Sequence, residues 1–105
     1  MLAEEVKSGK WKNEIILYDD GKYSAIWGNY NNSSLRCLGV RWNYSDDPSE
    51  KGFPNPRGNP QWYVEYGPLT KMILLGLLDI CVTKNDSDVK IGNILKALKE
   101  FKDQL

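Results

Sequence analysis

The chain has 105 residues, and its 14 Lys and Arg residues balance its 14 Asp and Glu residues, so the formal net charge is zero. Zero net charge gives no support to long-range attraction of nucleic acid or of an anionic membrane surface. Apolar residues make up 41% of the chain, which is close to the globular average and predicts a single folded domain over residues 1–105.

The sequence contains no histidine, which removes the most common general base and the usual histidine-containing metal sites. The glycine-rich phosphate-binding patterns G-x-x-x-x-G-K-[ST] and G-x-G-x-x-G do not occur in the sequence. We therefore expect no cofactor and no metal. Cys37 and Cys81 are far apart in sequence and do not form a C-x-x-C pair. We therefore expect both cysteines to be reduced and unpaired.

The N-terminal half begins with a weak helical signal and continues as a β-hairpin. Residues 2–9 predict either a short helix or a frayed arm. Residues 14–19 (EIILYD) and 22–28 (KYSAIWG) are two β-rich runs joined by Asp-Gly, the strongest short hairpin signal. We expect Asp19 and Asp20 to stabilise this turn, with a metal or catalytic role as a remote alternative.

Two further strands are predicted at residues 35–43 and 61–67. In the first, alternation places Leu38, Val40 and Trp42 on one face. The opposite face carries Leu35, Cys37, Gly39, Arg41 and Asn43. The small residues there leave two interpretations open, a shallow floor under a ligand or, preferably, close packing of a helix. In the second strand Trp62, Val64 and Tyr66 share one face, and Tyr63 and Glu65 share the other.

Two helices follow. Residues 68–84 start with Pro68 at a first helical turn and are apolar on two sides, which predicts that the helix is covered on both. Residues 85–88 (NDSD) offer N-caps for a last helix. Its apolar stripe is Ile91, Ile94, Leu95, Leu98, Phe101 and Leu105. The predicted fold class is α+β: a four-stranded antiparallel meander, with or without a short N-terminal helix before it, is followed by two C-terminal helices packed on one sheet face.

The segment 41–63 (RWNYSDDPSEKGFPNPRGNPQWY) is the most unusual part of the sequence. It contains four of the five prolines, two of the three arginines and two of the four tryptophans. Proline steps stiffen a loop, arginine forms paired contacts with anions, and aromatic rings give large contact areas. The candidate binding residues are Arg41, Trp42, Tyr44, Phe53, Arg57, Trp62 and Tyr63. The alternative is a structural lid in which Trp42 and Trp62 form a cross-strand core pair.

These features favour a noncatalytic module that uses residues 41–63 to bind a small anionic or planar ligand or a protein partner. One alternative is a histidine-independent enzyme that uses carboxylates. It would need a lysine and two of four carboxylates to converge in one cleft, and the candidate carboxylates are Asp46, Asp47, Glu50 and Glu65. A single-strand nucleic-acid binder that stacks bases on Tyr23, Trp27 and Tyr63 is less favoured, because the net charge is zero and helices must occupy one sheet face.

Location and assembly follow from the apolar segments. The first residues lack the basic start and apolar run of a signal peptide, and the longest apolar segment, MILLGLLDICV, is too short to span a bilayer. We expect a cytoplasmic protein without membrane attachment. Because the helix at 68–82 has two apolar faces and one amphipathic helix to cover it, we also expect a homodimer.

Overall fold

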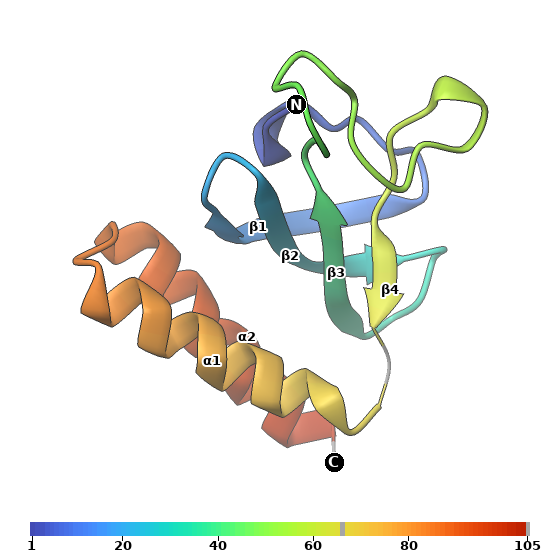
Figure 1. Cartoon of the computed structure of the whole chain (residues 1–105). Helices are drawn as coiled ribbons and strands as arrows, with labels where there is room; N and C mark the ends of the chain where they lie inside the picture. Colours follow the sequence, from blue (N-terminus) through green and yellow to red (C-terminus); the bar gives the residue numbers. More distant parts are fainter. Residues whose placement is uncertain (66, 105) are drawn as a thin grey trace.

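The computed structural model describes residues 1–65 and 67–104, and its elements are an antiparallel sheet followed by two helices (Figure 1). The elements are β1 Trp11–Asp19, β2 Tyr23–Tyr30, β3 Arg36–Trp42, β4 Tyr63–Glu65, α1 Leu69–Thr83 and α2 Asp88–Gln104. Short 3₁₀ turns lie at Ala3–Glu5 and Pro56–Gly58. The strands are adjacent in chain order, β1-β2-β3-β4, which confirms the predicted α+β fold with a four-stranded meander.

The main core lies between the helices and one face of the sheet. Alternation along β2 and β3 brings Ala25, Trp27 and Leu38 to this face, and each is fully buried. The buried helix residues that meet the sheet side chains are Leu74, Leu77, Cys81, Ile94 and Ala97. Both helices lie on the same side of the sheet, as predicted (Figure 1). Burying these side chains is the main source of stability for the helices, because isolated helices of this length are only marginally stable in water.

Arg36, at the start of β3, ties α2 to the sheet. Its Nε donates to Glu100 Oε1 at 2.8 Å and its Nη2 to Glu100 Oε2, while Trp27 Nε1 donates to Oε1 at 3.0 Å. The hydrogen bonds from Arg36 hold the pKa of Glu100 below its usual value. A two-pronged contact of this kind has defined geometry, so it sets the position of the last turns of α2 on the strands.

A second, smaller core covers the opposite face of the sheet. It contains Ala3 from the N-terminal turn, Trp11 from β1, Ile26 from β2 and Trp62 from the end of the long loop. The ring of Trp11 lies directly over Gly39, because a Cβ at Gly39 would come within 2.8 Å of Trp11 Cη2. The preferred interpretation of the small residues on β3 is therefore wrong, since an aromatic ring packs there and not a helix.

Strand boundaries differ from the prediction at both edges of the sheet. β1 begins at Trp11, three residues earlier than expected. The prediction missed these residues because a register shift between Lys12 and Ile15 breaks the alternation on which it depended. Asn13 lies within this shift with φ of 55°, as β-bulges allow. Within the described residues β4 covers Tyr63–Glu65, so it begins two residues later than expected. Two residues named in the sequence patterns, Tyr66 and Leu105, lie outside the part of the chain that the structure describes.

The hairpin between β1 and β2 uses its two aspartates to close the turn. Asp19 Oδ1 accepts the N–H of Gly21 at 2.9 Å, and Asp20 Oδ1 accepts the N–H groups of Lys22 and Tyr23 at 2.9 and 2.7 Å. Gly21 has φ of 93°, a conformation that glycine adopts without strain. The predicted turn role of both aspartates is confirmed.

Both cysteines are free thiols, and they lie in the two cores on opposite sides of the sheet, Cys37 from β3 and Cys81 from α1. Cys37 packs against the second core, whereas Cys81 is buried in the main core. Burial raises the pKa of Cys37 to about 11, and burial together with Asp86 raises the pKa of Cys81. A thiol with a raised pKa carries little thiolate at neutral pH and reacts slowly.

We therefore expect an aromatic disulfide reagent at pH 8 to detect two thiols immediately after unfolding in denaturant, without any reductant. In the native protein the same reaction should be much slower. A count of zero thiols in the unfolded, unreduced protein would contradict this prediction, because it would require both cysteines to be in disulfides.

Candidate functional site

Arg41 holds the two limbs of the long loop to β3. Its guanidinium is fully buried on the sheet face opposite the helices, where Nη1 donates to the carbonyl of Gln61 at 3.1 Å and Nη2 donates to the carbonyl of Lys51. The ring of Trp62 lies over the guanidinium, with its centroid 5.8 Å from Cζ. Burial lowers the pKa of Arg41, since the charge is compensated only by carbonyl dipoles and an aromatic face. The side chain is a clamp for residues 51–61.

The loop is fixed at two further points close to the end of β3. Asn43 is fully buried, donates through Nδ2 to Asp19 at 2.9 Å and accepts the hydroxyl of Ser24 at 2.7 Å. Gly52 has φ of 73°, and a Cβ there would collide with the backbone carbonyl of Trp42. Only glycine can pass β3 this closely, so the loop returns to the strand at a defined place.

Phe53 extends the pairing of β3 beyond β4. The N–H of Phe53 donates to the carbonyl of Trp42 at 2.8 Å, and the N–H of Trp42 donates to the carbonyl of Phe53 at 2.9 Å. Residues paired in this way project their side chains to the same face of a sheet. Phe53 therefore lies beside Trp42 on the face that carries the helices.

The strand register places four aromatic side chains in two adjacent rows on that face. One row runs Tyr23, Trp42, Phe53, and the next continues from Val40 to Tyr63. The rings of Tyr23 and Trp42 meet edge to face, with centroids 4.9 Å apart. Trp42, Phe53 and Tyr63 are 47%, 48% and 55% exposed, and Tyr23 is half-buried. We call these four residues the aromatic surface.

The aromatic surface is exposed because the helices cover a different part of the same face. The row after Val40 and Tyr63 contains Trp27 and Leu38, which are fully buried in the main core. α1 begins just past the end of β4 that is remote from the loop and runs from there toward the β1 side (Figure 1). The loop end of β3 is left without a helix above it.

The seven predicted binding residues are thus divided between the two faces of the sheet. Trp42, Phe53 and Tyr63 are brought together, whereas Arg41 and Trp62 are buried on the opposite face. Neither residue belongs to the aromatic surface: the Arg41 guanidinium donates to carbonyls of the loop, and Trp62 lines a cavity on the opposite face, so their role in binding stays a prediction. Trp42 and Trp62 also do not form the cross-strand core pair that was the alternative, because they lie on opposite faces.

The two remaining predicted residues lie apart from these clusters. Arg57 is exposed in the 3₁₀ turn Pro56–Gly58 with φ of 54°, and makes no ion pair within the described residues. Tyr44 is half-buried, and Lys22 Nζ lies 5.7 Å from its ring centroid. Neither residue adds an anion-binding group to the aromatic surface in this structure.

Tyr23 is the member of the aromatic surface that the binding prediction omitted. It appeared only as a base-stacking candidate in the nucleic-acid alternative, next to Trp27, which is fully buried and cannot stack on a ligand. A hairpin centred on the polar residues 31–34 pairs position 23 with position 42. The spacing of the two strands therefore already indicated that Tyr23 lies beside Trp42.

Two of the four carboxylates considered for the enzyme alternative, Glu50 and Asp47, stabilise turns. Glu50 Oε1 accepts the N–H groups of Asp46 and Asp47, both at 2.9 Å, and Asp47 Oδ1 accepts the N–H of Ser49 at 2.9 Å. Hydrogen bonds from the backbone of Asp47 and Asp46 lower the pKa of Glu50. Glu65 is on β4, opposite Leu38. No pair of these groups faces a common cleft.

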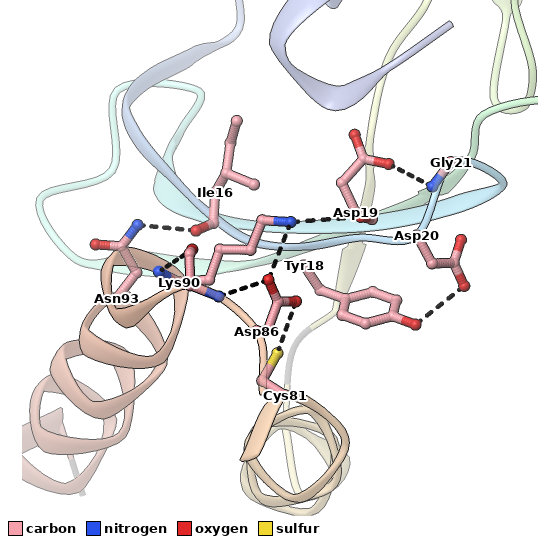
Figure 2. A network of polar contacts seen from close by, with 10 residues as sticks. Ile16, Tyr18, Asp19, Asp20, Gly21, Cys81, Asp86, Lys90 and Asn93 are labelled. Carbon is pink, nitrogen blue, oxygen red and sulfur yellow. Dashed lines mark hydrogen bonds and ion pairs between the residues drawn. The ribbon is translucent and has the colours of Figure 1, made fainter. Parts of the chain in front are cut away.

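A second polar cluster, shown in Figure 2, joins the turn between the helices to β1. Lys90 Nζ lies 3.8 Å from Asp86 Oδ1 and donates to the carbonyl of Asp19 at 3.4 Å, while the Cys81 thiol lies 3.7 Å from Asp86 Oδ2. Asn93 Nδ2 donates to the carbonyl of Ile16 at 2.8 Å. The α2 side chains therefore satisfy outward carbonyls of an edge strand, which protects that edge from pairing with another chain.

The structure also shows a cavity that the sequence did not predict. It measures about 440 Å³ and lies between the N-terminal segment and the sheet face opposite the helices. Its lining mixes apolar side chains such as Val6, Ile16 and Ile26 with Lys7 and Glu14. Within residues 1–65 and 67–104, no three Cys, Asp or Glu side chains are grouped so that they could hold a metal ion.

Comparisons with protein-family models, with curated proteins and with solved structures gave no match. Among the described residues, neither helix combines the length and apolar character that crossing a membrane requires. Function is therefore inferred from the geometry of the surface alone.

Proposed function

We propose that this protein is a noncatalytic interaction module that binds an extended segment of a protein partner through the aromatic surface. The observation that carries the proposal is the exposure of Trp42, Phe53 and Tyr63, each about half accessible, on one sheet face next to Tyr23. Aromatic side chains are enriched at protein interfaces because they bury a large area with few rotatable bonds.

The framework beneath the aromatic surface supports binding with little loss of conformational freedom. Trp42 and Tyr63 belong to paired strands, and Phe53 is held by two backbone hydrogen bonds and by the close passage of Gly52. The buried Arg41 clamp keeps the rest of the loop in place. A surface that is already ordered avoids much of the entropy cost of association.

The chemistry of the surface favours an extended segment with apolar and proline side chains. Successive rows of a sheet face are about 7 Å apart, which is close to the repeat of alternate side chains in an extended peptide. Proline-containing segments dock on exposed aromatic rings in this way because they are already extended. The small-anion form of the prediction has less support, because Arg41 is committed to loop carbonyls.

The fluorescence of Trp42 can report directly on binding at the aromatic surface. The other tryptophans, Trp11, Trp27 and Trp62, are at most 6% exposed, so quenching of fluorescence by iodide reports mainly on Trp42. The purified chain is titrated with an array of extended peptides that contain proline and apolar residues, with glycine-serine peptides of equal length as the reference. We expect protection of Trp42 from iodide by some proline-containing peptides and by none of the references.

Tyr63→Ser is the variant that tests the location, because Tyr63 is exposed and its loss leaves the core intact. We expect it to weaken peptide binding about tenfold or more, as truncation of an interface aromatic residue often does. Leu35→Ser is the matched control, since Leu35 is 54% exposed at the opposite end of β3. Equal weakening by both variants, or protection by a mixed oligonucleotide or a planar dye but by no peptide, would reject the protein-partner proposal.

A further inference from the structure

The second exposed apolar surface of the molecule is the side of α1 that faces away from the main core. Its apolar residues are Leu69, Met72, Leu75, Ile80 and Val82, which are between 36% and 68% exposed. The side of the same helix that packs on the sheet and α2 is formed by Thr70, Leu74, Leu77 and Cys81. We call the five exposed residues the α1 outer face.

This exposure differs from the expectation that α2 would cover the helix. α2 packs along one flank of α1, and the buried α2 residues Ile94 and Ala97 contact the core side. The α1 outer face is left in contact with solvent, although a surface helix normally presents charged residues there. An apolar helix face of this length is a typical mark of an interaction site.

The charges of α1 are arranged so that the helix is complementary to a second copy of itself. Within Leu69–Thr83 the only charged residues are Lys71 and Asp79, and Leu75 lies midway between them. Each charge is four residues from Leu75, which is about 6 Å along the helix axis. Two α1 helices crossing antiparallel at Leu75 would bring Lys71 of each copy level with Asp79 of the other.

Other observations agree with this arrangement. Lys71 and Asp79 are both exposed, and neither makes an ion pair or hydrogen bond within the described part of the chain. Gly76 follows Leu75, and nothing lies within 4 Å of the position that its Cβ would occupy. A missing side chain beside the crossing point lets two helix axes approach closely. We propose that the α1 outer face binds a second copy of this chain, forming a two-fold symmetric, antiparallel α1 pair.

Sedimentation equilibrium from low to high micromolar concentration tests the assembly. The monomer mass is 12.0 kDa, and we expect the wild-type chain to approach twice this mass. Leu75→Glu places two like charges at the symmetry axis and should leave a monomer at the same concentrations. Because Leu75 is 46% exposed, the substitution should not disturb folding, and the spectrum of the folded variant should match that of the wild-type chain. Leu35→Glu, at a similarly exposed leucine away from α1, should remain dimeric.

Charge reversal tests the antiparallel register. Lys71→Asp and Asp79→Lys each create two repulsive pairs in the proposed dimer, and we expect each to raise its dissociation constant about tenfold or more. The double variant K71D/D79K restores both pairs with opposite sign and should return to near the wild-type constant. A structural role in the monomer would not produce this recovery, since the two residues are eight positions apart and do not meet on one helix.

A wild-type mass of 12.0 kDa at every concentration would overturn the proposal, and so would a double variant that dissociates as readily as the single ones. The α1 outer face shares no residue with the aromatic surface. Tyr63→Ser should therefore leave the dimer mass unchanged, and peptide binding to K71D should be retained. The two proposals can fail separately.

Discussion

Arg41→Ala is expected to lower the free energy of unfolding by about 3 kcal/mol or more, although the residue lies in segment 41–63, whose composition is typical of a binding site. The substitution leaves the partly buried carbonyls of Lys51 and Gln61 without their donors and opens a space beneath Trp62. A buried polar group that loses its partner costs about 1–3 kcal/mol. Release of the buried charge offsets only part of this loss, because the carbonyl groups remain oriented toward the site.

Chemical denaturation with urea at neutral pH measures this effect, with Arg57→Ala as the matched control. Arg57 is exposed in the turn Pro56–Gly58 and should change stability by less than about 0.5 kcal/mol. Arg41→Lys tests the geometry, because lysine keeps the charge but cannot donate to two carbonyls as a planar fork. We expect it to be destabilised nearly as much as the alanine variant. Equal stability of Arg41→Ala and Arg57→Ala would show that the clamp contributes nothing.

Leu77→Ala is expected to lower the free energy of unfolding by about 2–5 kcal/mol, the usual range for truncation of a buried leucine. Leu77 is 6% exposed and belongs to the core between α1 and the sheet. Leu98→Ala should fall near the lower end of the range, because Leu98 is only partly buried at the edge of that core. The loss comes from apolar contacts removed and from a cavity that the neighbours fill incompletely.

Leu75→Ala is the control for this series, since it makes the same chemical change on the same helix at a residue that is 46% exposed. Its effect should be within about 0.5 kcal/mol when unfolding is followed at low protein concentration, where association adds little to stability. A loss at Leu77 no larger than that at Leu75 would contradict the orientation of α1 described above.

The Arg41 clamp and the aromatic surface together account for the unusual composition of segment 41–63. Its arginine at position 41, its glycine at position 52 and its asparagine at position 43 hold the loop, and each does so from a buried or closely packed position. Trp42, Phe53 and Tyr63 then stay exposed on an ordered framework. The loop is therefore both a lid over one sheet face and the support of a surface on the other.

Much of the fold was determined by local patterns. The Asp-Gly hairpin, the alternation in β3 and the apolar stripe of the last helix depend on neighbours in sequence, and each predicted the observed element. The division of β3 into one face with Leu38 and Val40 and another with Arg41 was also correct, because a strand has a period of two wherever no bulge intervenes.

Tertiary structure decided which of those residues are accessible. The sequence marked Arg41 and Trp42 alike, but Arg41 is fully buried and Trp42 is 47% exposed, because a loop folds over one face of β3 and no helix reaches the end of the other. Likewise, alternation could not reveal that Trp11 lies over Gly39, since the bulge near Asn13 resets the register of β1. Residue type and spacing determine local conformation, whereas exposure depends on contacts between segments far apart in the chain, which no local pattern contains.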